Sequence, residues 1–275
     1  MKRCFVTLVM FGVVSGIVTQ ASAVLLPNNL VIRNSFNNNY NNSATGSASA
    51  GTTGNATANG DLNFVASDLT PGGQALQFPS SGNFADLEWD NAAVANASGS
   101  TGMTWSLWVV FGDLPSGAPG HYFNAQTDVS GGSGYLGYRH NTNDTLRGTS
   151  PGGFFNSFPS TADKENWHHL ALTVVPDGSQ FVAKVYLDGV QDGSASGAFD
   201  EITELKEMRI GEWTFIGEWR LYNTKIDEFR LYNVGMTDSQ IGQLATASEI
   251  PEPATMTLLV SALVGLAVRR NRRAH

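Results

Sequence analysis

The stretch that decides the fold is Met103-Thr104-Trp105-Ser106-Leu107-Trp108-Val109-Val110-Phe111. Side chains of a β-strand point alternately to its two faces. One face of this strand is fully apolar and holds Trp105, Leu107, Val109 and Phe111. The other face is mixed and holds Thr104, Ser106, Trp108 and Val110. We therefore predict a central strand with both faces mostly covered.

Short apolar runs broken by Gly, Asn, Asp and Pro continue on both sides of this stretch. The runs 169–175 and 181–187 flank Pro176-Asp177-Gly178, whose fixed φ, Asx hydrogen bond and tolerance of positive φ predict a hairpin. Further strands are expected at 30–36, 75–78, 84–90, 135–141, 205–211 and 226–232. This pattern predicts an all-β fold, with two antiparallel sheets in a sandwich or jelly roll.

One short C-terminal helix is expected in the domain, which we place at 24–248 because no linker or repeat divides it. Thr237-Asp238-Ser239-Gln240 is a capping box, and Ile241 and Leu244 follow on one helical face. We expect that face to seal one end of the sandwich.

Residues 28–60 are rich in Asn, Gly and Ser, with 8 Asn between positions 28 and 42. Such a composition buries too little apolar area to offset the entropy of ordering the chain. We therefore expect a mobile surface loop between the first two strands.

The first 23 residues have the three parts of a secretory signal peptide. Two basic residues precede an apolar run from Phe5 to Val18, and the small residues Ala21 and Ala23 fit a signal peptidase, so the mature chain is expected to begin at Val24. The alternative, a retained N-terminal membrane helix, is disfavoured because the run is shorter than the ~20 residues that span a bilayer. The only cysteine, Cys4, lies in the segment to be removed, which excludes a disulfide or thiolate chemistry in the exported protein.

The charge of the domain excludes one class of partner. Residues 24–248 hold 10 Lys and Arg against 22 Asp and Glu, a net charge of −12. A domain this acidic has no basic footprint for nucleic acid.

The C-terminus carries a second sorting element within residues 249–275. Pro251-Glu252-Pro253 precedes an apolar segment at 254–268, which precedes the basic residues Arg269, Arg270, Arg272 and Arg273. An apolar segment of 15 residues is marginal as a permanent span, so we expect a transient insertion in the inner membrane. These three elements resemble the PEP-CTERM sorting signal of Gram-negative bacteria. The resemblance implies cleavage by an exosortase and release to the cell surface or extracellular matrix, and the alternative is a plain C-terminal anchor.

Several strings of the body, in this order, resemble the laminin-G-like, or concanavalin A-like, lectin domain. They are Gly73–Phe78, Trp105–Val109, Asn166–Leu172, Val185–Gly189, Arg209–Gly211 and Lys225–Asn233. The resemblance implies a jelly roll in which Trp167 is a core aromatic, Asp188-Gly189 is a turn, and Asp227 and Arg230 are polar residues near the closing strand. Members often bind carbohydrate or protein at one rim, sometimes with calcium.

The same fold hosts glycoside hydrolases, whose catalytic carboxylates lie on one strand as Glu-x-Asp-x-x-Glu or Glu-x-Asp-x-Glu. Asp86, Glu88 and Asp90 share a strand face here, but their order, Asp-x-Glu-x-Asp, departs from that motif. We favour a solvated face with Leu87 and Trp89 turned inward. Three further acids repeat every three residues, a spacing that fits a solvated edge better than a catalytic pair: Glu201, Glu204 and Glu207.

Metal binding is expected only as calcium, if at all. His168 and His169 are adjacent, so on a strand they point to opposite faces, and His121 and His140 are isolated. We expect these to be surface or core-edge histidines with their hydrogen bonds satisfied. Calcium prefers oxygen ligands from Asp, Asn and carbonyl groups, and the candidates are Asp128, Asn141 and Asp144. Ordinary turn chemistry explains the same residues.

The sequence thus predicts an exported, non-catalytic binding or adhesion module for an extracellular polysaccharide or surface protein. The alternatives are a polysaccharide hydrolase of the same fold and a purely structural matrix protein. No nucleophile elbow, phosphate-binding loop or nucleotide fingerprint occurs.

Overall fold

The computed structural model describes residues 27–69, 72–80, 85–90, 94, 101–113, 119–127, 135–140, 145–150, 153–155, 165–178, 180–199, 205–211 and 221–246. The predicted signal peptide and sorting segment lie outside these residues. Within the described part of the chain, no helix is long and apolar enough to cross a membrane.

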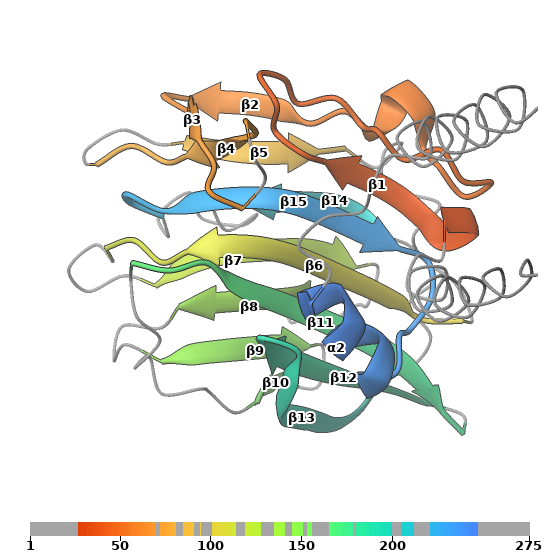
Figure 1. Ribbon diagram of the computed structural model, residues 1–275. Coiled ribbons are helices and arrows are strands. Elements are labelled where there is room, and N and C mark those ends of the chain that lie inside the picture. The colour runs from red at the N-terminus through yellow and green to blue at the C-terminus, as the bar shows by residue number, and fades with distance from the viewer. Residues whose placement is uncertain are drawn as a thin grey trace, which may run out of the picture. The chain divides into compact units, whose positions relative to one another are not determined.

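The domain is a sandwich of two antiparallel sheets, as predicted (Figure 1). The eight-stranded sheet has the order β13-β12-β11-β6-β15-β4-β3, and β1 also pairs with β15. Its strands are β1 (Leu30–Asn34), β3 (Asn63–Ala66), β4 (Gln74–Gln77), β6 (Met103–Val110), β11 (His168–Asp177), β12 (Gln180–Leu187), β13 (Val190–Phe199) and β15 (Lys225–Tyr232). The seven-stranded sheet has the order β10-β9-β8-β7-β14-β5-β2. Its strands are β2 (Thr57–Gly60), β5 (Ala85–Trp89), β7 (Gly120–Thr127), β8 (Tyr135–His140), β9 (Leu146–Ser150), β10 (Gly153–Phe155) and β14 (Leu205–Ile210).

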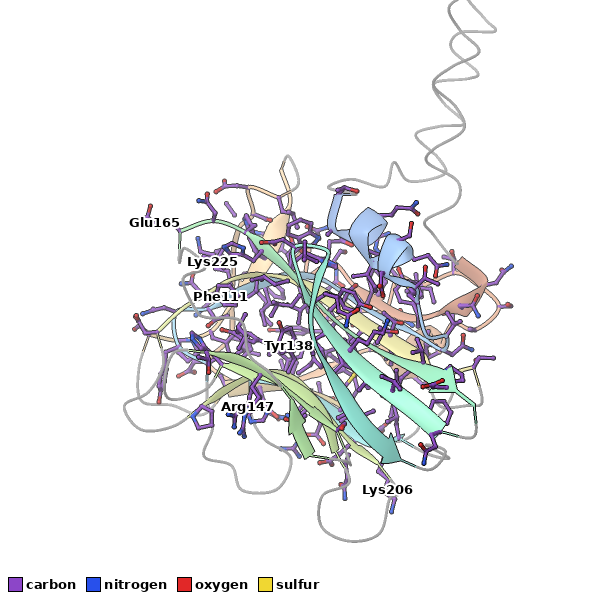
Figure 2. All side chains as sticks on the ribbon, turned by 90° about the horizontal axis from the view of Figure 1, so that it is seen from below. Phe111, Tyr138, Arg147, Glu165, Lys206 and Lys225 are labelled. Atoms are coloured by element: carbon purple, nitrogen blue, oxygen red, sulfur yellow. The ribbon has the colours of Figure 1, made fainter. Side chains whose placement is uncertain are left out.

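The central strand β6 lies between β11 and β15, and its alternation places one face in the main core. Trp105 is fully buried there, its ring stacks on Phe123 of the opposite sheet at a centroid distance of 5.6 Å, and its Nε1 donates to Met208 Sδ at 3.0 Å. The predicted hairpin is also present, since Asp177 pairs with Gln180 at the end of the β11–β12 ladder. Figure 2 shows Tyr138 between the two layers and Arg147 on the outer side of the seven-stranded sheet.

The predicted helix is α2 (Asp238–Thr246), and its capping box forms. The Thr237 amide donates to Gln240 Oε1 at 2.9 Å. Its position differs from the prediction, because α2 lies on the outer face of the eight-stranded sheet and not at the end of the sandwich (Figure 1). Ile241 and Leu244 pack there against outward-facing residues of three strands, Ala171, Tyr186 and Tyr232.

The Asn-rich segment contains more structure than its composition suggested. It includes the 3-10 turns Pro27–Asn29 and Gly51–Gly54 as well as β2. Asn42 Oδ1 accepts from the amides of Arg33 and Ala44, and its Nδ2 donates to the carbonyls of Val31 and Gly51. Asparagine side chains thus bond backbone groups that a neighbouring strand would otherwise bond. The prediction of a mobile loop considered only apolar area and chain entropy, and did not include these hydrogen bonds.

Candidate functional site

The outer face of the seven-stranded sheet carries the candidate site. Leu87 and Trp89 of β5 lie in the core, which confirms their predicted direction and leaves Asp86 and Glu88 on the outer face. On β14, Met208 and Ile210 are buried, so Glu207 and Arg209 share that outer face. The ladder pairs Arg209 directly with Glu88 and brings both strands' polar side chains together.

Arg209 is the centre of this group, which we call the Arg209 cluster: Asp86, Glu88, Glu207 and Arg209. Its guanidinium lies 3.6 Å from a carboxylate oxygen of Asp86, 3.6 Å from one of Glu88 and 3.8 Å from one of Glu207. The side chains of Glu88, Glu207 and Arg209 are partly exposed, so the cluster reaches the surface.

Asp86 forms the base of the cluster. Its side chain has no exposed surface, and neither carboxylate oxygen meets hydrogen-bond geometry with the described residues. Burial raises the pKa of Asp86, while Asn59 opposite it on β2 and the Arg209 charge act in the other direction. The prediction of a solvated face is therefore wrong for Asp86. The separate prediction of a solvated edge is wrong for the position of Glu207, because β14 lies between β7 and β5, although the Glu207 side chain is partly exposed. Glu201 and Glu204 lie outside the described residues.

The burial of Asp86 and the shared guanidinium bear on the comparison with a retaining glycosidase. Such an enzyme needs two carboxyl groups about 5–5.5 Å apart on either side of an accessible glycosidic bond. Here the three carboxylates share one guanidinium, and Asp86 is closed to a substrate. The cluster is instead suited to hydrogen bonding with hydroxyl groups, because it presents both charged donors and charged acceptors.

The polar face continues across β7, β8 and β9. Asn124 pairs with Arg209, and the next strands bring Arg139 and Thr149 to the same face. His121 is completely buried there, and burial together with the charge of Arg139 lowers the pKa of His121 to about 3. It is therefore neutral near pH 7. The sequence prediction did not include β7 or β9, and in β7 a bulge after His121 breaks the alternation.

A second group of charges lies on the outer side of the eight-stranded sheet. Burial raises the pKa of Asp227 to about 7, with the Glu228 charge adding to this effect; Ser67, whose Oγ donates to Asp227 Oδ2 at 2.8 Å, opposes it. Glu228 occupies a bulge with φ of 48° and accepts from both Arg33 and Arg230. The burial of these side chains indicates a structural role. We call Arg33 of β1 together with Glu228 and Arg230 of β15 the charge clasp, because their contacts join the two strands.

The remaining histidines confirm the predicted geometry. His168 stacks on Phe111 at a centroid distance of 5.3 Å, and its Nδ1 lies 2.8 Å from Asp188 Oδ2. His169 lies on the other face against Trp108, also at 5.3 Å. His169 and His140 are buried, and the His169 ring nitrogens have no hydrogen-bond partner among the described residues, so within that part of the chain the expectation of satisfied hydrogen bonds is wrong for His169. Asp188-Gly189 forms the predicted turn, with positive φ at both residues.

The calcium candidates Asp128, Asn141 and Asp144 lie outside the described residues, as do the signal-cleavage and sorting residues. Among the residues that the structure does describe, no group of three or more His, Cys, Asp or Glu side chains could hold a metal ion.

A two-sheet β-sandwich with a polar outer sheet face defines the class of protein: a lectin-like jelly roll. The model of the concanavalin A-like lectin/glucanases superfamily matches residues 81–242, and the chain belongs to this superfamily. The PEP-CTERM protein-sorting motif matches residues 249–273 and indicates export and surface sorting in Gram-negative bacteria. The superfamily contains both lectins and glucanases, so membership alone leaves binding and hydrolysis open.

Solved structures share the fold at low identity. Domain 4 of AbnA, an extracellular arabinanase from Geobacillus stearothermophilus, was solved with arabinotriose; it is 20% identical, with a TM-score of 0.54 over 79% of this chain and 98% of that one. The binding domain of botulinum neurotoxin serotype D/C is 13% identical, with a TM-score of 0.55 over 82% of this chain and 53% of that one. A search of curated proteins found no match.

Proposed function

We propose that the chain is an exported, non-catalytic carbohydrate-binding module that acts at the cell surface or in the extracellular matrix. The observation that carries this proposal is the Arg209 cluster, in which one guanidinium is held by three carboxylates on the outer face of a rigid sheet. Charged groups fixed in this way hydrogen-bond sugar hydroxyls without first losing side-chain freedom.

Two further observations support the proposal. The arabinanase domain shows that a domain of this fold and size occurs in complex with an oligosaccharide. The sorting motif supports processing by an exosortase, which would bring the module to the surface, where we expect polysaccharides as its partners.

The test of binding is affinity electrophoresis of the purified protein in gels containing β-glucan, arabinan, xylan or galactomannan. Arg209→Gln removes the charge that organises the carboxylates, and we expect at least a ten-fold loss of affinity, typical of a central contact residue. Lys206→Gln is the matched control, because Lys206 is an exposed cation on the same strand and lies outside the Arg209 cluster. Equal affinity of Arg209→Gln and wild type would remove the Arg209 cluster from the proposal.

The hydrolase alternative makes a different prediction for the same proteins. Release of reducing sugar from β-glucan, lost in Glu88→Gln, would establish catalysis and overturn the non-catalytic role. Absence of both binding and hydrolysis across the panel would favour a structural matrix protein.

Export has its own test. Intact-mass analysis of the surface protein should find that residues 1–23 and the C-terminal segment beyond the Pro251–Pro253 region are missing. Retention of residues 254–275 would contradict exosortase cleavage and indicate a permanent anchor.

A further inference from the structure

Helix α2 covers only part of the outer face of the eight-stranded sheet. It packs over Ala171, Tyr186 and Tyr232, toward one end of the strands. Toward the other end, the same face carries five partly exposed residues, which we call the aromatic platform: Trp108, Trp167, Val110, Lys225 and Gln77.

The strand register brings these residues together. Lys225 pairs with both Val110 and Gln77, which forms one row across three strands. In the next row, Trp108 pairs with His169 of β11. Trp167 is two residues before His169, so alternation places it on the same face, diagonal to Trp108 and within reach of an aromatic side chain.

The exposure of the two indoles is unusual for this molecule. Trp89 and Trp105 are completely buried, whereas Trp108 and Trp167 are partly exposed and belong to neither hydrophobic cluster. The prediction that Trp167 is a core aromatic is therefore wrong. Neighbouring, partly exposed aromatic residues on a sheet face are suited to contact with a ligand, because they offer apolar surface outside the hydrophobic core.

A built polar layer lies beside the platform. His169 is 1% exposed, and neither ring nitrogen has a hydrogen-bond partner among the described residues, although its ring packs edge-on against Trp108. Ser106 Oγ and Arg230 Nε in the adjacent row are also buried and lack such a partner. Buried polar atoms without partners are rare in proteins, and they mark places where a bound water completes the hydrogen bonds, here directly beneath the platform.

We propose that the aromatic platform is a second carbohydrate site, on which the apolar ring face of a neutral sugar stacks against Trp108 and Trp167 while Lys225 and Gln77 bind its hydroxyls. The net charge of −12 over residues 24–248 disfavours an acidic polymer, which leaves neutral polysaccharides as the charge-compatible class. Indole rings combine a rigid apolar surface with a polar edge, which suits a ligand of alternating apolar and hydroxyl character.

The platform and the Arg209 cluster lie on the outer faces of different sheets, on opposite sides of the sandwich. One molecule therefore has two binding faces that point away from each other, a geometry that joins two polysaccharide chains and prevents one short oligosaccharide from occupying both sites. This inference goes beyond the proposed function, since it adds a second site and a cross-linking activity.

The experiment compares wild type with Trp167→Ala, Trp108→Ala and Arg209→Gln by titration calorimetry with neutral oligosaccharides from the electrophoresis panel. We expect two sites per wild-type molecule and one site in each variant, with at least a ten-fold loss at the altered site. Val190→Ala is the matched control, because Val190 is a large apolar residue, 66% exposed, on the same sheet but outside the platform. Wild type should also raise the viscosity of a neutral polysaccharide solution, and each single-site variant should not.

The outcomes separate the two proposals. Two sites in both tryptophan variants would overturn the platform, whatever Arg209→Gln does. Loss of the second site in the tryptophan variants with unchanged binding in Arg209→Gln would support the platform and contradict the Arg209 cluster. Binding of alginate in preference to neutral polymers would overturn the assigned ligand class. If Trp108→Ala fails to fold, Trp167→Ala and Trp108→Tyr decide, with an unaltered melting temperature as the requirement for interpretation.

Discussion

Trp105 and Trp108 lie three residues apart on β6, yet they belong to two different surfaces of the same sheet. Trp105 is on the inner face, fully buried, with its ring stacked and its Nε1 bonded to Met208. Trp108 is on the outer face and partly exposed. It lies beside His169, whose pKa burial lowers to about 3, and beside the bulged strand β15, which carries buried charges. The inner face is packed mainly through apolar contacts. The outer face carries helix α2, the charge clasp and the aromatic platform, which the helix does not cover.

The difference teaches where stability and function separate in this domain. Apolar contacts between the sheets contribute most of the stability, and they do not determine which ligand the protein binds. The polar groups of the outer face lower stability when they lack partners, so their presence there calls for a different explanation.

The largest expected effect is on the inner face. Trp105→Ala removes a fully buried indole from between the sheets and leaves a cavity, which should cost about 3–5 kcal/mol in the free energy of unfolding. That is a large part of a total stability of roughly 5–15 kcal/mol. Urea unfolding measures it, and Trp108→Ala is the comparison, since a partly exposed indole should cost less. Equal losses in the two variants would contradict the distinction between the faces.

The inner face was predictable from the sequence because period-two alternation determines it. Trp105, Leu107 and Val109 are buried as predicted, and the capping box at Thr237 identified the helix start correctly. Both signals come from residues close together in the chain, so they can be recognised in a single sequence.

The outer faces were not predictable in the same way. The Arg209 cluster joins β5 and β14, more than 100 positions apart, and only the sheet order reveals the pairing. Helix α2 packs on Ala171, Tyr186 and Tyr232, and residue alternation does not show which part of the sheet face a helix covers. Glu228 lies at a bulge with positive φ, which alternation does not predict either.

A pH titration probes the charges on the outer face. Burial raises the pKa of Asp227 to about 7 from an ordinary value near 3.8, so the folded state favours the protonated acid. The stabilisation from this group is fully present below about pH 4 and is lost as the pH rises toward 7, by an amount on the order of 4 kcal/mol.

Asp227→Asn tests this assignment because the amide imitates the protonated acid. Its carbonyl can accept from the Glu228 amide and its NH₂ can donate to Ser67 Oγ, the two neighbours that Asp227 contacts. Melting temperatures between pH 5 and pH 8 should fall less in Asp227→Asn than in wild type. Parallel curves would show that Asp227 does not titrate in this range. The contacts of Glu228 with Arg33 and Arg230 would then be charged at every pH tested.

Calcium binding concerns three candidate residues that lie outside the described part of the chain. We propose that Asp128, Asn141 and Asp144 supply oxygen ligands, so that calcium at ten times its dissociation constant raises the free energy of unfolding by about 1.4 kcal/mol. Melting curves with calcium, magnesium and chelator measure the effect. Asp128→Ala should remove most of the calcium response, and identical curves in calcium and chelator would end this proposal.

The smallest expected effect concerns the helix that divides the outer face into covered and uncovered parts. Thr237 caps α2, since its amide donates to Gln240 Oε1 and its Oγ1 accepts from the Gln240 amide at 3.4 Å. Thr237→Ala removes the second contact and should cost about 1 kcal/mol. Because Ile241 and Leu244 still anchor the helix over Tyr186 and Tyr232, the loss should appear as fraying of its first turn. Hydrogen exchange of the amides at 238–241 should therefore accelerate, while exchange in β6 and binding at the aromatic platform should stay unchanged. Faster exchange in β6 as well would show that the helix supports the whole sheet face, and that the covered and uncovered parts are not independent.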